Sequence, residues 1–158
     1  MRTLKKEEIA HFIDEAVKTA SYATCIRARC GCVIVQKSEI IGKGYNSPPN
    51  ERESQRRCSQ DKSKMHPKIT DKTCCVHAEQ RAIIDAIKKN PDKVEGSQLL
   101  FVRLDPKGEI APAGEPYCTL CSKMALDVRV KEFILLHTKG PIAYDTEEYN
   151  KRSYQYGN

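Results

Sequence analysis

The sequence predicts an α/β protein in which helices cover one mixed β-sheet. Helical and strand-like patterns alternate along the chain in the order helix, hairpin, loop, helix, strand, helix, strand, helix. This alternation is typical of layered α/β folds, because helices that follow strands can pack back onto the faces of the sheet. A chain of 158 residues is also long enough to bury a substantial core, and we expect a single domain over residues 1–158.

The charge and the hydropathy pattern narrow the class of protein. The 27 Lys and Arg against 21 Asp and Glu give a formal net charge of +6. This balance favours an anionic partner such as a nucleotide or a nucleic acid, and it fits a merely soluble basic surface equally well. No apolar run approaches the roughly 20 residues that a membrane-spanning helix needs. Since the first residues also lack the apolar core of a secretory signal, we expect a cytoplasmic protein.

The first helix and the hairpin follow from the spacing of apolar residues. Residues 5–20 carry apolar side chains three and four positions apart, with charges between them, which predicts an amphipathic helix. Two short apolar runs follow, at residues 32–35 and 40–45. The polar residues 36–39 between them indicate a turn, so the two runs predict a β-hairpin.

A long polar segment separates the hairpin from the second helix. Residues 47–73 are rich in Arg and Lys, and a loop of this length inside a small domain needs a structural or functional reason. Residues 77–89 then predict a helix with one apolar face, because cations and Asn90-Pro91 mark its end.

The last third of the sequence predicts two strands and two helices. Residues 97–104 indicate a strand, and turn residues after it lead into a hairpin-like insertion at 105–114. A helix is expected at 118–127, a strand at 130–137 and a short helix at 145–156.

Two distant motifs carry the chemistry of this sequence. His77 stands two residues before Glu79, and Cys118 and Cys121 follow about forty residues later. One His and two Cys can give three N and S ligands to Zn²⁺ and leave the fourth position for water, as in a catalytic zinc site. Cys118 and Cys121 would share one face of a first helical turn, where the positive end of the helix favours thiolates. A redox Cys pair is the alternative, but it would not need the His-x-Glu motif.

These motifs resemble the zinc-dependent cytidine and deoxycytidylate deaminase superfamily, and most closely its deoxycytidylate (dCMP) deaminase branch. The resemblance rests on Cys25-Ile26-Arg27 with Gly31-Cys32-Val33-Ile34-Val35, on Gly44-Tyr45-Asn46, on His77-Ala78-Glu79-Gln80 with Ala82-Ile83, and on Cys118 through Lys123-Met124. It implies a three-layer α-β-α sandwich around a mixed five-stranded sheet, in which the two zinc-bearing helices lie side by side.

The resemblance also implies an activity. A Zn²⁺ site formed by His77, Cys118 and Cys121 would activate water, and Glu79 would act as general acid and base. The expected reaction is hydrolytic deamination of a cytosine nucleotide, from dCMP to dUMP and ammonia. The alternatives are a zinc deaminase of free cytidine or deoxycytidine, of a modified nucleotide or of a base in single-stranded nucleic acid, and a zinc-binding module without turnover.

Four further residues are candidates for substrate contacts. Asn46 and Ala78 match positions that line the substrate site in the family, although Asn46 is also a common turn residue. Arg27 is the first candidate for the phosphate, because a guanidinium binds phosphate in bidentate fashion, and Arg52, Arg56 and Arg57 in the long loop are alternatives. Tyr117 occupies the place of the Pro that usually precedes the first Cys, which leaves the choice of substrate open.

The remaining cysteines raise the question of a second metal. The chain has eight Cys, and without a secretory route these indicate reduced thiols with metal roles rather than disulfides. Some dCMP deaminases carry a second, structural zinc, and the matching positions here are Cys25, Cys58, His66 and Cys75, with Cys74 as an alternative to His66. Ordinary free thiols are the competing interpretation. The resemblance further implies a homo-oligomer, either dimer or hexamer, with dCTP and dTTP as candidate allosteric effectors.

Overall fold

The computed structural model describes residues 1–157. Its strands are β1 (Arg2–Thr3), β2 (Arg29–Gln36), β3 (Glu39–Tyr45), β4 (Gln98–Leu104), β5 (Ile110–Ala111), β6 (Glu132–His137) and β7 (Gly140–Asp145). Its helices are α1 (Ala10–Ala20), α2 (Ala78–Lys89), α3 (Thr119–Asp127) and α4 (Thr146–Ser153). Short 3-10 turns are η1 (Lys6–Ile9), η2 (Pro49–Glu51), η3 (Glu53–Gln55), η4 (Lys62–Lys64) and η5 (Pro91–Lys93).

Within the described residues the strands form one mixed sheet of seven, in the order β1-β7-β6-β4-β2-β3, with β5 paired to β4. The pairing of β4 with β6 is parallel and the other pairings are antiparallel. The expectation of five strands was therefore too low. The two additional strands, β1 and β5, have two residues each, which is too short to leave a periodic pattern in the sequence.

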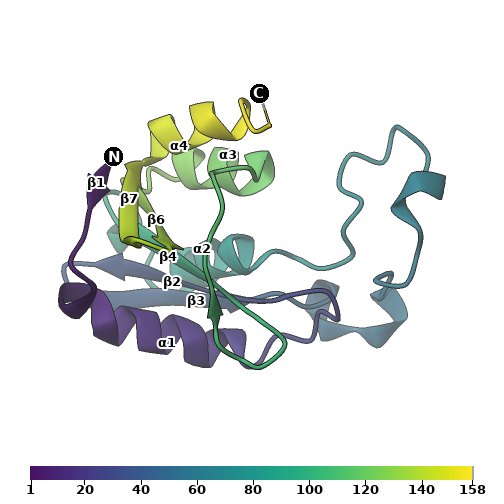
Figure 1. Cartoon of the computed structure of the whole chain (residues 1–158), viewed down its shortest axis with the longest axis horizontal. Helices are drawn as coiled ribbons and strands as arrows, with labels where there is room; N and C mark the ends of the chain where they lie inside the picture. Colours follow the sequence, from purple (N-terminus) through teal and green to yellow (C-terminus); the bar gives the residue numbers. More distant parts are fainter. Residues whose placement is uncertain (158) are drawn as a thin grey trace.

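The three-layer α-β-α arrangement is confirmed. Helix α1 covers one face of the sheet, and α2, α3 and α4 lie over the other face (Figure 1). On the α1 face, Ile13 and Ala16 pack with Val33 and Leu100. On the opposite face the buried cluster includes Phe133, whose ring stacks on that of Tyr149 in α4. The sheet is thus buried on both sides, as expected for a layered α/β fold.

Strand β7 was not anticipated from the sequence, which indicated no element between the strand that ends at residue 137 and the helix that starts at 145. The strand pairs antiparallel with β6, and it leads directly into α4. Pro141 stands near the start of the strand, and its carbonyl oxygen accepts a hydrogen bond from the backbone N–H of Leu4. A proline has no N–H group to donate to a neighbouring strand, but its carbonyl oxygen can still accept a hydrogen bond. It is therefore compatible with a position near the start of a strand.

The segment after β3 leaves the sheet and returns to the start of α2 (Figure 1). An isolated antiparallel bridge between Ser47 and Val76 closes this excursion at its base. The Arg81 side chain of α2 reinforces the closure, because its guanidinium donates to the backbone oxygen of Pro48 at 2.9 Å and to that of Ser47 at 3.3 Å. Among the described residues, no helix combines the length and the apolar character needed to cross a membrane.

Candidate functional site

The two zinc-type motifs lie at the starts of two neighbouring helices. His77 is the N-cap residue of α2, and its backbone N–H donates to Gln80 Oε1 at 3.1 Å. Cys118 is the N-cap residue of α3, and Cys121 lies in the first turn of that helix. Because helix N-termini carry unpaired N–H groups and a positive potential, this place stabilises negatively charged thiolates.

The structure brings His77, Cys118 and Cys121 together. His77 Nδ1 lies 3.2 Å from Cys121 Sγ and 3.3 Å from Cys118 Sγ. The three ligand atoms all lie within 4.8 Å of one another. A tetrahedral zinc ion with ordinary Zn–N and Zn–S bonds separates such N and S atoms by about 3.5 Å. The three ligand atoms and their spacing therefore fit Zn²⁺. Nδ1 is the ring nitrogen of His77 that faces the two thiols.

The three side chains shift one another's pKa values. A hydrogen bond with Cys118 raises the pKa of His77 to about 9. The hydrogen bond with Cys121, together with His77, lowers the pKa of Cys118 to about 4. The same hydrogen bond from Cys118, and burial, raise the pKa of Cys121. A metal that binds these three groups would displace protons from them.

Glu79 lies beside this group in the first turn of α2. Its side chain is buried, with 7% of its surface exposed. Burial raises the pKa of the Glu79 carboxyl to about 7. A carboxyl group with a pKa near neutrality can both accept and donate a proton, which is the property that general acid–base chemistry requires.

A cavity of about 310 Å³ opens next to these residues, and His77 and Glu79 contribute to its wall. Its volume is within the range of small-molecule sites. Four cations line it, namely Arg27, Arg57, Lys62 and Lys72. The sequence pointed to Arg27 and Arg57 but not to the two lysines, because nothing in a cation-rich loop indicates which side chains face a cavity.

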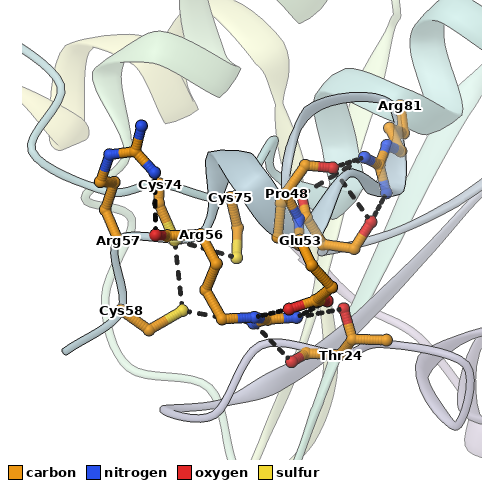
Figure 2. Close-up of polar contacts among 10 residues, drawn as sticks. Thr24, Pro48, Glu53, Arg56, Arg57, Cys58, Cys74, Cys75 and Arg81 are labelled. Atoms are coloured by element: carbon orange, nitrogen blue, oxygen red, sulfur yellow. Dashed lines mark hydrogen bonds and ion pairs between the residues drawn. The ribbon is translucent and has the colours of Figure 1, made fainter.

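The other two arginines considered for an anion have different surroundings. Arg56 forms a bidentate ion pair with Glu53, with both N···O distances at 2.7 Å, and also donates to the Thr24 backbone oxygen at 2.9 Å. Figure 2 shows this guanidinium enclosed by its partners. Neither Arg56 nor Arg52 contributes to the wall of the cavity.

The predicted substrate residues Asn46, Ala78, Arg27 and Tyr117 all line the cavity. The Asn46 side chain also holds the backbone, because its Oδ1 accepts from Cys30 N at 2.8 Å and its Nδ2 donates to Ala28 O at 2.9 Å. The Arg27 guanidinium donates to the Cys58 backbone oxygen at 3.0 and 3.2 Å. These contacts fix both side chains at the cavity wall before any ligand is bound.

Tyr117 stands at the mouth of the cavity, and 58% of its surface is exposed. Its ring is tilted against that of Tyr156, with 5.6 Å between the ring centroids. The C-terminal residues therefore support the side chain that replaces the usual proline. This contact could not be read from the sequence, because Tyr156 lies almost forty residues further along the chain.

A second group of thiols also lines the cavity. The Sγ atoms of Cys25, Cys58 and Cys75 lie within 4.8 Å of one another. Cys74 joins them, since its Sγ is 3.2 Å from Cys58 Sγ and 3.8 Å from Cys75 Sγ (Figure 2). The structure places His66 outside this group, where its Nδ1 accepts a hydrogen bond from the Lys68 backbone N–H at 3.1 Å.

One thiol of this second group has a lowered pKa. Burial acts to raise the pKa of Cys58, but hydrogen bonds from Cys74 and Arg56 outweigh it and lower the pKa to about 7. The Arg56 contact to Cys58 Sγ measures 3.4 Å. Burial raises the pKa of Cys75 in the absence of metal. Three mutually close sulfur atoms, with Cys74 Sγ beside two of them, match the ligand type of a closed structural zinc site, which has four ligands.

Comparison with known proteins gives a consistent result. The family model described as the cytidine and deoxycytidylate deaminase zinc-binding region matches residues 6–137. The deoxycytidylate deaminase of Schizosaccharomyces pombe is 26% identical over 135 residues, which cover 82% of this chain and 36% of that protein. The deoxycytidylate deaminase of Saccharomyces cerevisiae is 27% identical over 132 residues, with 79% and 36% covered. The chain thus spans about a third of the length of these relatives.

Two solved structures share the fold. The dCMP deaminase of the cyanophage S-TIM5, in complex with dCMP and dUMP, has a TM-score of 0.57 and 22% identity, with 82% of this chain and 81% of that chain covered. The cytidine deaminase of Burkholderia pseudomallei also has a TM-score of 0.57, with 14% identity and coverage of 89% and 94%. At these identities the likeness concerns the arrangement of the sheet and its helices.

Proposed function

The chain belongs to the family defined by the cytidine and deoxycytidylate deaminase zinc-binding region, and on this basis we propose that it deaminates dCMP to dUMP with release of ammonia. One observation carries the proposal. The buried carboxyl group of Glu79 lies beside three convergent zinc-type ligands at the wall of a cavity that four cations line. The deoxycytidylate deaminases among its relatives support the choice of a nucleotide over a nucleoside.

In this proposal His77 Nδ1, Cys118 Sγ and Cys121 Sγ hold Zn²⁺. Zinc supplies a Lewis acid that brings the pKa of water from 15.7 to near 7. The Glu79 carboxylate accepts a proton from the attacking water, whose oxygen bonds to C4 of the cytosine ring. Glu79 then delivers this proton to ring N3. It next takes the proton of the new C4 hydroxyl group and passes it to the exocyclic nitrogen, so that the C4–N4 bond breaks, ammonia leaves and the C4 keto group of uracil forms.

The walls of the cavity suggest how the nucleoside is held. Ala78 and Phe101 present apolar surface next to Glu79, and they would pack against the pyrimidine ring. Asn46 Nδ2 carries a second hydrogen beyond the one donated to Ala28, so the amide keeps capacity for a sugar hydroxyl. Tyr117 would close the mouth of the cavity over the ligand.

The cations at the cavity wall support recognition of the phosphate. Arg27 is held by backbone oxygens of the long loop, so its charge is fixed in place before the ligand arrives. Arg57, Lys62 and Lys72 add three further positive charges from the same loop. A phosphate that contacts several cations at once gains charge-assisted hydrogen bonds, which a nucleoside cannot form.

We further propose a structural zinc bound by Cys25, Cys58, Cys74 and Cys75, in which Cys74 rather than His66 is the fourth ligand. Such a site would tie the long loop to the segment that precedes β2, and it would hold the loop cations over the cavity. Assembly into a dimer or a hexamer, regulation by dCTP or dTTP and a cytoplasmic location remain predictions.

The test of the proposed function is a comparison of substrates on the zinc-loaded protein. Ammonia release is measured from dCMP, CMP, deoxycytidine, cytidine and a short single-stranded DNA. We expect kcat/KM for dCMP to exceed that for deoxycytidine by at least about 100-fold, because loss of charge-assisted contacts costs about 3 kcal/mol. Equal values for the two would exclude a nucleotide-specific enzyme, and activity on DNA alone would favour a nucleic-acid deaminase.

The loop cations provide a second arm of the same test. In the double variant Lys62→Ala/Lys72→Ala we expect a higher KM for dCMP and an unchanged kcat/KM for deoxycytidine. Lys5→Ala/Lys6→Ala is the matched control, since these lysines lie in and before η1 and do not line the cavity. If the two double variants behave alike toward dCMP, the loop lysines do not contact the phosphate.

A further inference from the structure

The histidine of the zinc-type group has a hydrogen-bonded partner on its second ring nitrogen. His77 Nε2 lies 3.2 Å from Thr73 Oγ1, on the side of the ring away from the two thiols. Thr73 Oγ1 in turn donates to Asp71 Oδ1 at 2.6 Å. The same carboxylate oxygen accepts the Thr73 backbone N–H at 3.0 Å. Asp71, Thr73 and His77 therefore form a continuous chain of polar contacts.

The direction of this chain follows from the number of protons available. His77 Nδ1 faces both Cys118 Sγ and Cys121 Sγ, so it is the nitrogen that can bind a metal, and it must then be unprotonated. A neutral imidazole carries its proton on the other nitrogen, so Nε2 is the donor and Thr73 Oγ1 the acceptor. The Thr73 hydroxyl group can then donate its single hydrogen to Asp71 in a hydrogen bond.

We propose that Thr73 and Asp71 are positioning residues for the metal ligand: the Thr73 hydroxyl holds His77 in the tautomer and ring orientation that direct Nδ1 at the zinc, and Asp71 orients that hydroxyl. The proposal rests on the zinc site of the proposed function. Thr73 also lines the cavity, but in this proposal both residues act through His77. Partners of this kind on the outer nitrogen of a ligating histidine commonly change metal affinity by 10- to 100-fold when removed.

The position of the pair in the chain gives it a wider role. Thr73 directly precedes Cys74, at the end of the segment that the Ser47–Val76 bridge closes. The path of the long loop is therefore joined to the orientation of His77. Because Thr73 and Asp71 are exposed, water competes for their hydrogen bonds, and we expect an effect near the lower end of the range, about 10-fold.

The experiment compares Thr73→Val, which keeps the shape but removes the hydroxyl, with Thr73→Ser, which keeps the hydroxyl. Zinc affinity of the full-length protein is measured by competition with a chromophoric chelator, and the step that belongs to His77 is identified by its loss in Cys118→Ser. We expect about 10-fold weaker binding in this step for Thr73→Val and less than 2-fold for Thr73→Ser. Thr70→Val, an exposed threonine of the same loop, is the matched control and should bind zinc as the wild type does.

A second readout reports on the tautomer itself. In ¹⁵N-labelled zinc-loaded protein, long-range ¹H–¹⁵N spectra show which ring nitrogen of His77 carries the proton and how fast that proton exchanges. We expect a protected Nε2–H in the wild type and faster exchange in Thr73→Val. Wild-type zinc affinity and exchange in Thr73→Val would overturn the inference, whether or not the protein deaminates dCMP. Weakened zinc binding in Thr73→Val, in a protein that fails to deaminate dCMP, would leave the inference standing and remove the proposed function.

Discussion

Gly44 of β3 lies directly against Ala78 at the start of α2. A Cβ atom added at Gly44 would come within 2.2 Å of the Ala78 backbone oxygen and 2.3 Å of the Ala82 backbone nitrogen. Only a glycine allows a helix backbone to approach a strand this closely. Since His77 and Glu79 flank Ala78, this contact sets the height of both side chains above the sheet.

Substitution of Gly44 tests this relationship. We expect Gly44→Ala to lower the free energy of unfolding by about 2–3 kcal/mol, because helix backbone has to move away from the strand. Urea denaturation measures the change. Gly114→Ala is the matched control, because a Cβ at Gly114 meets nothing within 4 Å. Equal denaturation midpoints for the two variants would show that α2 is not seated on β3 in this way.

Glu79→Gln tests the proton-transfer role. The substitution keeps the size of the side chain but removes the group that accepts and donates protons, so we expect kcat for dCMP to fall by about 10²- to 10⁴-fold. Bound zinc, counted per chain by elemental analysis, should stay unchanged. Glu7→Gln, in the exposed η1 turn, should retain full activity. A Glu79→Gln protein with full activity and full zinc content would exclude the carboxyl group from the mechanism.

The second thiol group makes its own prediction for metal content. We expect two zinc ions per chain in the wild type and one in Cys58→Ser, together with a loss of stability above about 2 kcal/mol, because metal binding to a structural site contributes directly to folding. Cys30 belongs to neither thiol group found in the described part of the chain. Cys30→Ser should therefore keep both ions, and a wild-type protein with one zinc would contradict the structural site.

The N-terminal strand provides a pH-dependent stability test. Arg2 binds Glu132 through two contacts of 2.8 Å, and this hydrogen-bonded pair lowers the pKa of the Glu132 carboxyl. A lowered carboxyl pKa means that the stabilisation is present above the unfolded value, near 4.3, and is lost as the pH falls through the folded value.

For Arg2→Met we therefore expect a deficit of about 0.5–1 kcal/mol at pH 7, kept small because Arg2 is exposed to solvent. The deficit should shrink progressively below about pH 4, as measured by urea denaturation at a series of pH values. A deficit that stays constant down to pH 3 would show that the lost contacts are apolar rather than ionic.

The parts of the fold that the sequence predicted are those with a repeating pattern or a motif. The hairpin of β2 and β3 and the helices α2 and α3 have apolar residues at regular spacing, and their observed bounds differ from the expected ones by a few residues at most. Strand β7 was missed because its six residues, which begin with Gly140-Pro141, do not form a pattern typical of a strand. Its pairing with β6 depends on the tertiary position of the strand rather than on local sequence.

The residues of the candidate site likewise include some that the sequence could identify and some that it could not. His77, Glu79, Cys118 and Cys121 could be named because three zinc-type ligands and a Glu two residues after the His form a recognisable motif. The contribution of Lys62, Lys72 and Thr73 depends on the path of the long loop, which tertiary contacts such as those of Arg56 and Arg81 determine.

The same loop path explains why Cys74, rather than His66, lies next to the other thiols of the second group. From the sequence, His66 and Cys74 were both open as the fourth ligand. The structure directs the His66 ring toward the Lys68 backbone instead, and it brings Cys74 Sγ next to Cys58 Sγ. No spacing rule could separate these two, because residues 65–77, which include both, contain no helix or strand.

The most direct test of the central claim is conversion of dCMP to dUMP by one preparation of the full chain before and after zinc removal. The protein is assayed as purified, after dialysis against a chelator, and after zinc is returned. We expect ammonia release from dCMP in the first state, its loss in the second and its recovery in the third, in proportion to the zinc bound. Undiminished turnover by the zinc-free protein, or no turnover of dCMP by a protein with the His77 site filled, would contradict the account.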